Sequence, residues 1–175
     1  MIKKIILAVV VLLVAVLIYA ATQPDTFSVQ RAVLVKAPSE KIFPLINDFH
    51  NWSAWSPWEK LDLTMKKTHS GAVSGKGAVY GWEGNNKVGQ GSMEITESTS
   101  PASLIIKLDF IKPYEGHNIA EFTLQTQGEA TNVQWLMHGP SPYMTKIMGV
   151  FFDMDSMIGK DFEAGLANLK TLAEK

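Results

Sequence analysis

The sequence contains no cysteine, and this absence excludes several kinds of site at once. Without thiols the chain cannot form disulfides, zinc–thiolate centres or a cysteine nucleophile. An excess of one charge is also missing, because 16 basic and 17 acidic side chains give a formal net charge of −1. We therefore expect no nucleic-acid partner held by phosphate electrostatics. With 175 residues, the chain is long enough for one domain with a sizeable core.

Motifs for common cofactors and for hydrolysis are absent as well. No GxSxG occurs, so the usual nucleophile elbow of hydrolases is missing. The two GxG pairs, at 75–77 and 89–91, lack the strand-to-helix context of a dinucleotide site and are typical of turns or bulges. The four histidines are scattered without metal-ligand spacing. We expect no cofactor and no metal site.

One long hydrophobic run stands near the start of the chain. Residues 5–21 contain no charge, Gly or Pro, and Lys3 and Lys4 precede them. The length is at the short end of the ~17–25 residues that a membrane-spanning helix uses. A signal peptide is the alternative, but its apolar region is usually ~7–15 residues long, and Ala20-Ala21-Thr22 matches a cleavage site only weakly. The run favours an uncleaved anchor over residues 1–22, followed by a tether at 23–26.

The two lysines also predict the orientation of this anchor. Positive residues favour the cytoplasmic side, and after the run no Lys or Arg follows until Arg31. The N-terminus is then cytoplasmic, and the domain at 27–175 lies across the membrane. We expect a single-pass protein of the cell (inner) membrane with an extracytoplasmic, periplasmic domain.

From Phe27 onward the hydrophobic pattern changes to the period of two that is typical of strands. Phe27, Val29 and Val33 share one face of the first segment. Two short helical segments follow, the second within Asn47–Trp58. Six more strand-like segments come next, separated by turn residues such as Gly84-Asn85-Asn86. Such short connections predict an antiparallel meander.

The last stretch, 143–175, carries one apolar stripe at helical spacing. Met144, Ile147 and Phe151 open the stripe, and Gly149 is expected to separate a short helix from a main helix beginning near Asp155. This stripe is the only large cover available for the apolar face of the sheet. We therefore predict an α+β fold with a curved, seven-stranded antiparallel sheet wrapped around a long C-terminal helix. Two short helices follow the first strand, and one transmembrane helix precedes it.

The element order, the segment APSEKIFPLINDFHNWSAWSPW and the final segment IGKDFEAGLANLK resemble the START-like (SRPBCC, helix-grip) superfamily, and within it the polyketide cyclase/dehydrase-like group. The resemblance covers residues 27–175. It implies a deep apolar cavity between sheet and terminal helix, which relatives use for lipids, sterols, polyketides or other hydrophobic molecules. Relatives also include aromatase/cyclases and partner-binding proteins of the Hsp90-activator type. Most soluble relatives lack an anchor, so the run at 5–21 departs from them.

The inner-face positions and the Trp-rich segment supply the candidate ligand-binding residues. Trp52, Trp55 and Trp58 recur every three residues, which is typical of a packed plug and also suits a pocket lip. Large apolar side chains of the strands and of the final stretch complete the set. The predicted cavity-lining residues are Phe43, Trp55, Trp58, Tyr80, Trp82, Phe110, Phe122, Trp135, Met137, Met148, Phe151, Phe152 and Phe162.

Three polar side chains are weak candidates for acid–base catalysis. Tyr80, Glu97 and Arg31 lie in phase with inward-facing neighbours on their strands, where each could polarise a carbonyl or hold a head group. A simpler interpretation places them near strand ends, in contact with water. An enzyme usually needs two or more convergent titratable groups, and the predicted inner face carries almost none.

Three hypotheses about function stay open at this point. The first is a membrane-anchored, non-catalytic domain that binds a hydrophobic or amphipathic small molecule or lipid and contacts the bilayer through residues 5–21. The second is a cyclase/dehydrase-like enzyme acting on a polyketide-like or aromatic substrate. The third is an interaction module with a filled core, which docks a protein partner through the surface at Trp52–Trp58.

Overall fold

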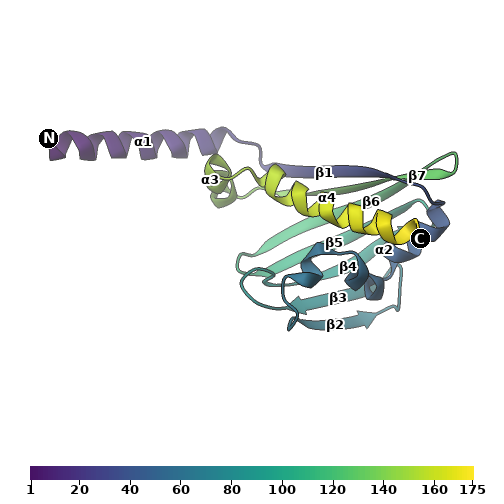
Figure 1. Cartoon of the computed structure of the whole chain (residues 1–175). Coiled ribbons are helices and arrows are strands. Elements are labelled where there is room, and N and C mark those ends of the chain that lie inside the picture. Colours follow the sequence, from purple (N-terminus) through teal and green to yellow (C-terminus); the bar gives the residue numbers. More distant parts are fainter.

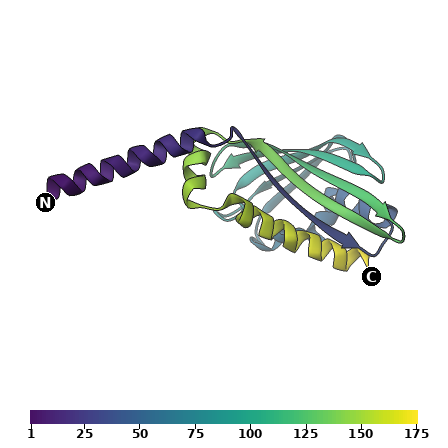
Figure 2. The same cartoon turned by 90° about the horizontal axis from the view of Figure 1, so that it is seen from above.

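The computed structural model describes residues 1–175. A long helix, α1 (Ile2–Thr22), projects from a domain in which a curved sheet faces a second long helix, α4 (Met154–Ala173). Figures 1 and 2 show α4 lying across the concave side of the sheet, with α1 pointing away from it. This arrangement confirms the predicted α+β, helix-grip architecture.

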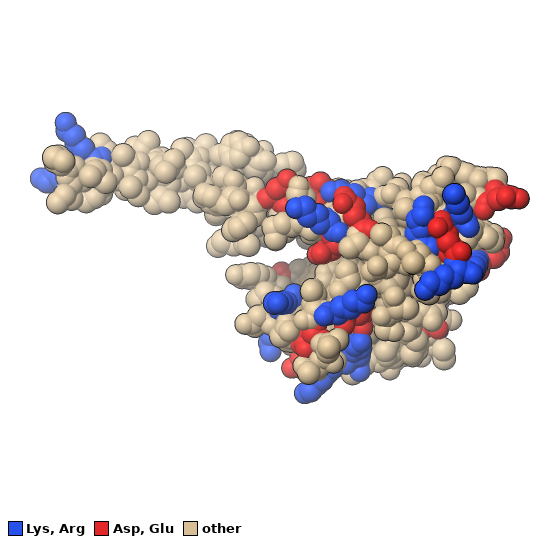
Figure 3. All heavy atoms as spheres, in the orientation of Figure 1, with Lys and Arg blue, Asp and Glu red and all other residues tan.

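The helix α1 is long and apolar enough to cross a membrane. It is almost entirely exposed, and Ala20 is its one buried residue, so it forms no part of the core. Figure 3 shows it as a projection that carries charge only at its tip, where Lys3 and Lys4 lie. Length and composition of this kind occur in membrane anchors and in signal sequences alike.

The sheet contains seven antiparallel strands in the order β1-β7-β6-β5-β4-β3-β2. Each strand from β2 to β6 pairs with the next along the chain, and β1 pairs with β7. The predicted meander is therefore confirmed. The strands are β1 (Thr26–Val35), β2 (Lys66–Gly71), β3 (Ala78–Glu83), β4 (Gln90–Thr99), β5 (Ser103–Lys112), β6 (Gly116–Gln127) and β7 (Ala130–Pro140).

Short helical segments connect β1 to β2. The helix α2 (Ser39–Asn47) is followed by two 3-10 helices, η1 (Phe49–Ala54) and η2 (Pro57–Lys60). The indole N–H of Trp52 donates to the Ile46 carbonyl and that of Trp55 to the Leu45 carbonyl, both at 2.9 Å. These bonds let both indoles enter the core with their polar atom paired. Both indoles are buried, as a packed plug requires, and Trp52 also borders the cavity described below.

A break at Phe152 divides the C-terminal stretch into α3 (Tyr143–Phe151) and α4. The side chain of Asp153 caps α4 by accepting a hydrogen bond from the backbone N–H of Ser156 at 3.0 Å. A carboxylate is favourable there because the N-terminus of a helix carries partial positive charge. The predicted division into a short and a main helix is thus confirmed, but the prediction that Gly149 separates them was wrong, because Gly149 lies within α3. The helix α3 lies against the end of α1 (Figure 1).

The core lies where β6 and β7 meet α4. The ring of Trp135 stacks on that of Phe162, with centroids 4.1 Å apart and planes inclined by 5°. Phe122 tilts against Trp135 at 4.8 Å. All three side chains are buried, which confirms the predicted phase of both strands. Burial of such apolar area, at ~25 cal/mol per Å², is the dominant stabilising contribution.

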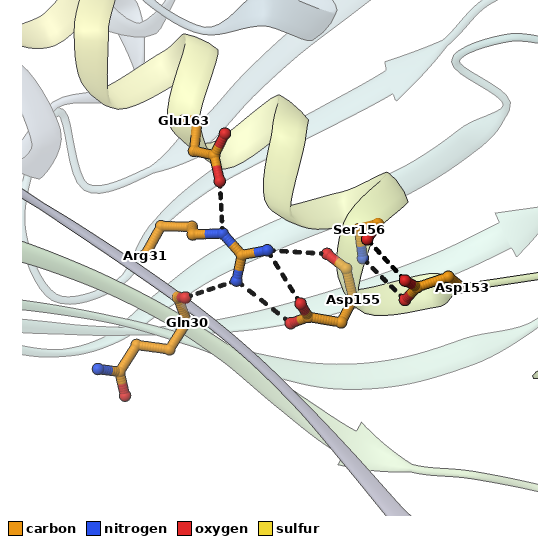
Figure 4. A network of polar contacts seen from close by, with 6 residues as sticks. All are labelled: Gln30, Arg31, Asp153, Asp155, Ser156 and Glu163. Carbon is orange, nitrogen blue, oxygen red and sulfur yellow. Dashed lines mark hydrogen bonds and ion pairs between the residues drawn. The ribbon is translucent and has the colours of Figure 1, made fainter.

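Arg31 fastens β1 to the first turns of α4 (Figure 4). Its Nε donates to Glu163 Oε1 at 2.7 Å, and its Nη2 donates to Asp155 Oδ2 at 3.0 Å. Gly159 lies directly beside the guanidinium, and a Cβ there would stand 1.9 Å from Nη2. The missing side chain at Gly159 therefore leaves the space that Arg31 fills.

A matched pair of glycine substitutions tests this close approach. Gly149→Ala in α3 places its Cβ in open space, so we expect the free energy of unfolding to rise by about 1 kcal/mol. Gly159→Ala has the same propensity gain but displaces Arg31 from its carboxylates, and we expect a net loss of about 1 kcal/mol. Denaturant unfolding of the full-length protein in mild detergent measures both. Equal stabilisation by the two substitutions would contradict the packing of Arg31 over Gly159.

Candidate ligand-binding site

A cavity of about 460 Å³ lies between the sheet and α4. Strands β3 to β7 line it together with η2 and α4, and 16 of its 26 lining residues are hydrophobic. Pockets that hold drug-sized ligands typically measure ~300–1,000 Å³. The interior of the grip is therefore large enough for a small molecule.

Seven of the thirteen predicted cavity-lining residues border this cavity. Aromatic rings make up much of the wall: Trp82 meets Phe110 edge-on with centroids 5.8 Å apart, and Trp58 meets Trp135 edge-on at 5.7 Å. The indole N–H of Trp135 is buried without a hydrogen-bond partner, so this residue contributes ring surface rather than a polar contact. The seven residues are Trp58, Tyr80, Trp82, Phe110, Trp135, Met137 and Phe162.

The other six predicted residues lie elsewhere. Phe43, Trp55 and Phe122 belong to the packed core and do not border the cavity. Phe151 and Phe152 border a second cavity beside α1, whereas Met148 borders neither. Periodicity shows that a side chain points inward, but not whether space remains in front of it.

The three weak catalytic candidates are not brought together. Tyr80 borders the cavity, whereas Arg31 is held by Asp155 at the start of α4 and by Glu163 near its middle. Glu97 is exposed on β4, because a bulge between Ile95 and Glu97 shifts the register and reverses the inward–outward alternation.

A polar cluster around Glu59 of η2 borders the cavity, and no sequence pattern revealed it. The Tyr80 hydroxyl donates to Glu59 Oε1 at 2.7 Å, and Lys67 forms an ion pair with Oε2. The Glu59 side chain is 8% exposed, so these two partners compensate for the lost hydration of the carboxylate. Burial, together with the bond to Glu59, raises the pKa of Tyr80 above its usual value. The phenol stays protonated at neutral pH and acts as a donor rather than a base.

Asp161 of α4, His117 at the start of β6 and Glu115 just before it add three titratable groups to the lining. Partial burial raises the pKa of the Asp161 carboxyl above its usual value. The Asp109 carboxylate, 2.7 Å from Nδ1, raises the pKa of His117. The prediction that the inner face carries almost no titratable groups concerned the strands, and the cavity as a whole carries more. Helices and a strand end supply these groups, rather than the middle of the strands.

The cavity opens at the end of the sheet nearest α1. Thr26 pairs with Pro140 and Phe110 pairs with Gly116, so the start of β1, the end of β7, the end of β5 and the start of β6 lie together. Phe27, Pro140 and Gly116 line the cavity at this end. Figure 3 shows a hollow in the domain on the side from which α1 projects. A ligand would enter from that side.

The fold and its cavity together define a helix-grip, ligand-binding class of domain. The sequence matches, over residues 26–174, the family described as polyketide cyclase / dehydrase and lipid transport, and the chain belongs to this family. No curated protein matches the sequence.

Several solved structures share the fold at low sequence identity. Protein CV1439 from Chromobacterium violaceum is 14% identical, with a TM-score of 0.59 over 87% of this chain and 99% of that one. Ginseng major latex-like protein 151 from Panax ginseng is 12% identical, with a TM-score of 0.63 over 87% and 100%. The di-domain ARO/CYC BexL from the BE-7585A biosynthetic pathway is 11% identical, with a TM-score of 0.65 over 90% of this chain and 53% of that one. At these identities the likeness shows the fold alone.

Proposed function

We propose that this chain is a membrane-anchored domain that binds a hydrophobic or amphipathic small molecule between its sheet and α4, without catalysing a reaction. The cavity of about 460 Å³, lined mainly by apolar side chains, is the observation that carries the proposal. Glu59, Tyr80 and Asp161 give the same wall a polar part, which suits a ligand with a polar group on an apolar body. A cavity of this size speaks against an interaction module built on a filled core.

The anchor in this proposal is α1. Apart from its C-terminal end, where Ala20 is buried and α3 lies against it, the helix is exposed and has no partner surface within the chain. Lys3 and Lys4 favour a cytoplasmic N-terminus and place the domain on the extracytoplasmic, periplasmic side of the cell (inner) membrane. In this arrangement 1–22 is the anchor, 23–26 the tether and 27–175 the binding domain.

A cyclase/dehydrase-like enzyme is the second candidate function, and the contact between Tyr80 and Glu59 in the cavity wall favours it. The single proton of the phenol is donated to Glu59, so its oxygen can orient a substrate by accepting a hydrogen bond from a substrate hydroxyl. Against this candidate, the other titratable groups of the lining are not hydrogen-bonded to this pair.

Photolabelling of the full-length protein in lipid nanodiscs tests the binding proposal. The probe is palmitic acid carrying a diazirine, and mass spectrometry of peptides locates its adducts. We expect adducts on cavity residues such as Met93, Leu108 and Met137, which border the cavity from three strands. Adducts confined to α1, with unlabelled cavity peptides, would overturn the proposal.

A matched pair of variants on β4 supplies the control. Met93 borders the cavity, whereas its neighbour Glu94 is exposed on the outer face. Met93→Trp fills part of the cavity, and we expect labelling of the cavity peptides to fall by about tenfold, equivalent to about 1.4 kcal/mol of binding free energy. Glu94→Trp adds the same indole outside, where labelling should match that of the parent.

A further inference from the structure

Exposed apolar side chains cluster around the mouth of the cavity. Met144 and Phe151 on α3 are 65% and 66% exposed, and Phe152 just after α3 is 54% exposed. Across the mouth, Ile111 at the end of β5 and Tyr114 in the turn before β6 are exposed. Exposed apolar groups gathered at one place mark an interaction surface.

The helix α3 has the pattern of a helix that lies on a membrane. Met144, Ile147, Met148 and Phe151 follow one another at steps of three and four, which places them along one side. The one cation of the helix, Lys146, forms an ion pair with Asp25 of the tether. Figure 2 shows α3 running across the end of α1 rather than along it. If α1 spans the bilayer, α3 therefore lies along the membrane plane.

A hydrogen bond sets the depth of α3 relative to α1. The Tyr143 hydroxyl donates to the carbonyl of Leu17 at 2.8 Å, and Leu17 lies five residues before the end of α1 at Thr22. At a rise of about 1.5 Å per residue, this position is about 7 Å inside the end of the helix. Helices that lie in the membrane interface reach about 5–10 Å into the boundary between head groups and acyl chains. The start of α3 is thus at the right depth for that boundary.

A second cavity, of about 590 Å³, lies beside the ligand site at this boundary. It lies between α1, the start of β1 and α3, and its lining includes Tyr19 of α1 and Phe151 of α3. Phe27, Thr145 and Met154 line both this cavity and the one under α4. The two cavities are therefore adjacent, with these three residues between them.

We propose that α3 lies in the membrane interface and that the second cavity is a portal through which acyl-chain lipids pass from the bilayer into the cavity under α4. The inference rests on the proposed function, because it requires α1 to span the membrane. The bilayer is the partner that fits the exposed apolar surface. The helix α1 leads directly to that surface, and α3 is hydrogen-bonded to α1. The lipid would enter sideways, so that its acyl chain need not cross water.

Spin labelling tests the position of α3. Because the chain has no native cysteine, each introduced cysteine is the only site that the label can modify. Nitroxides are attached to Met144→Cys and Phe151→Cys in the full-length protein, reconstituted in phosphatidylcholine–phosphatidylglycerol vesicles. Relaxation by membrane-soluble oxygen is compared with relaxation by a water-soluble nickel chelate. The controls are Val10→Cys in the middle of α1 and Val73→Cys, an exposed position in the turn between β2 and β3.

We expect oxygen to dominate at Val10→Cys and at both α3 positions, and nickel to dominate at Val73→Cys. If the α3 labels behave like Val73→Cys while Val10→Cys remains in lipid, the interfacial helix is overturned and the anchor stands. If Val10→Cys is also exposed to nickel, the anchor itself fails.

A substitution at Gly149 tests the portal. Gly149 lines the second cavity, and a Cβ there meets nothing within 4 Å. Gly149→Trp places an indole in the portal, and Gly149→Ala is the control for helix propensity. With the diazirine palmitic acid supplied in nanodiscs, we expect the rate at which cavity peptides become labelled to fall by about tenfold for Gly149→Trp. The same rate in both variants would overturn the portal, whereas absence of labelling in Gly149→Ala as well would contradict ligand binding itself.

Discussion

Replacing Phe162 by alanine is expected to lower the free energy of unfolding by about 3–5 kcal/mol, the range found when a buried Phe is removed from a core. Phe162 is 2% exposed and stacks on Trp135 with ring centroids 4.1 Å apart. Trp58 meets the Phe162 ring edge-on, with centroids 6.3 Å apart. Because these two indoles hold helix and sheet apart, the site cannot collapse to fill the space. The void would add to the cavity already beside it.

Denaturant unfolding of the full-length protein in mild detergent, followed by tryptophan fluorescence, measures this loss. Phe152→Ala is the matched control, because it removes the same ring from a position that is 54% exposed. We expect the control to change the free energy of unfolding by about 0.5 kcal/mol or less. A loss of less than about 1 kcal/mol for Phe162→Ala would mean that the stacking of α4 on β7 contributes little.

The sequence predicted most of the fold because burial imposes a period. Ile106 and Leu108 of β5, like Phe122 and Leu124 of β6, alternate with exposed or half-buried neighbours, and all four are buried. On α4 the buried residues, such as Phe162, Leu166 and Leu169, recur at steps of three and four. With the connections short, an antiparallel meander that closes on a helix is the arrangement that covers both apolar faces.

The candidate site was harder to predict, because it depends on small differences within the buried set. Trp55 and Trp58 are three residues apart, yet the first is fully buried in the core and the second borders the cavity. Whether an inward ring touches its neighbour or faces a void depends on how far the helix stands from the sheet. No local pattern encodes that distance.

Two further details depend on tertiary structure. The bulge after Ile95 turns Glu97 outward, and nothing in the local composition marks the extra residue. Glu59 meets Tyr80 across 21 positions of sequence, because η2 folds back over β3. The polar part of the cavity wall thus arises where two elements come together, and the periodicity of the sequence does not indicate that contact.

That contact leads to a second large effect. Tyr80→Phe is expected to lower the free energy of unfolding by about 1.5–3 kcal/mol, the contribution typical of a hydrogen bond to a charged group. The substitution removes the donor that lies 2.7 Å from Glu59 Oε1. The Glu59 carboxylate, whose side chain is only 8% exposed, then has Lys67 as its one remaining partner. Tyr114→Phe removes a hydroxyl from a residue that is 71% exposed, and its effect should stay within about 0.5 kcal/mol.

A double-mutant cycle separates the contact from the general cost of changing either residue. Glu59→Gln keeps the shape and an acceptor but removes the charge, so the bond from Tyr80 becomes a neutral one of about half the strength. We expect the loss caused by Tyr80→Phe to be smaller by about 1 kcal/mol when Gln stands at position 59. A coupling near zero in denaturant unfolding would show that the phenol does not stabilise the Glu59 carboxylate. It would also weaken the enzyme candidate, because a phenol that is not held in place has no fixed direction in which to accept a hydrogen bond from a substrate.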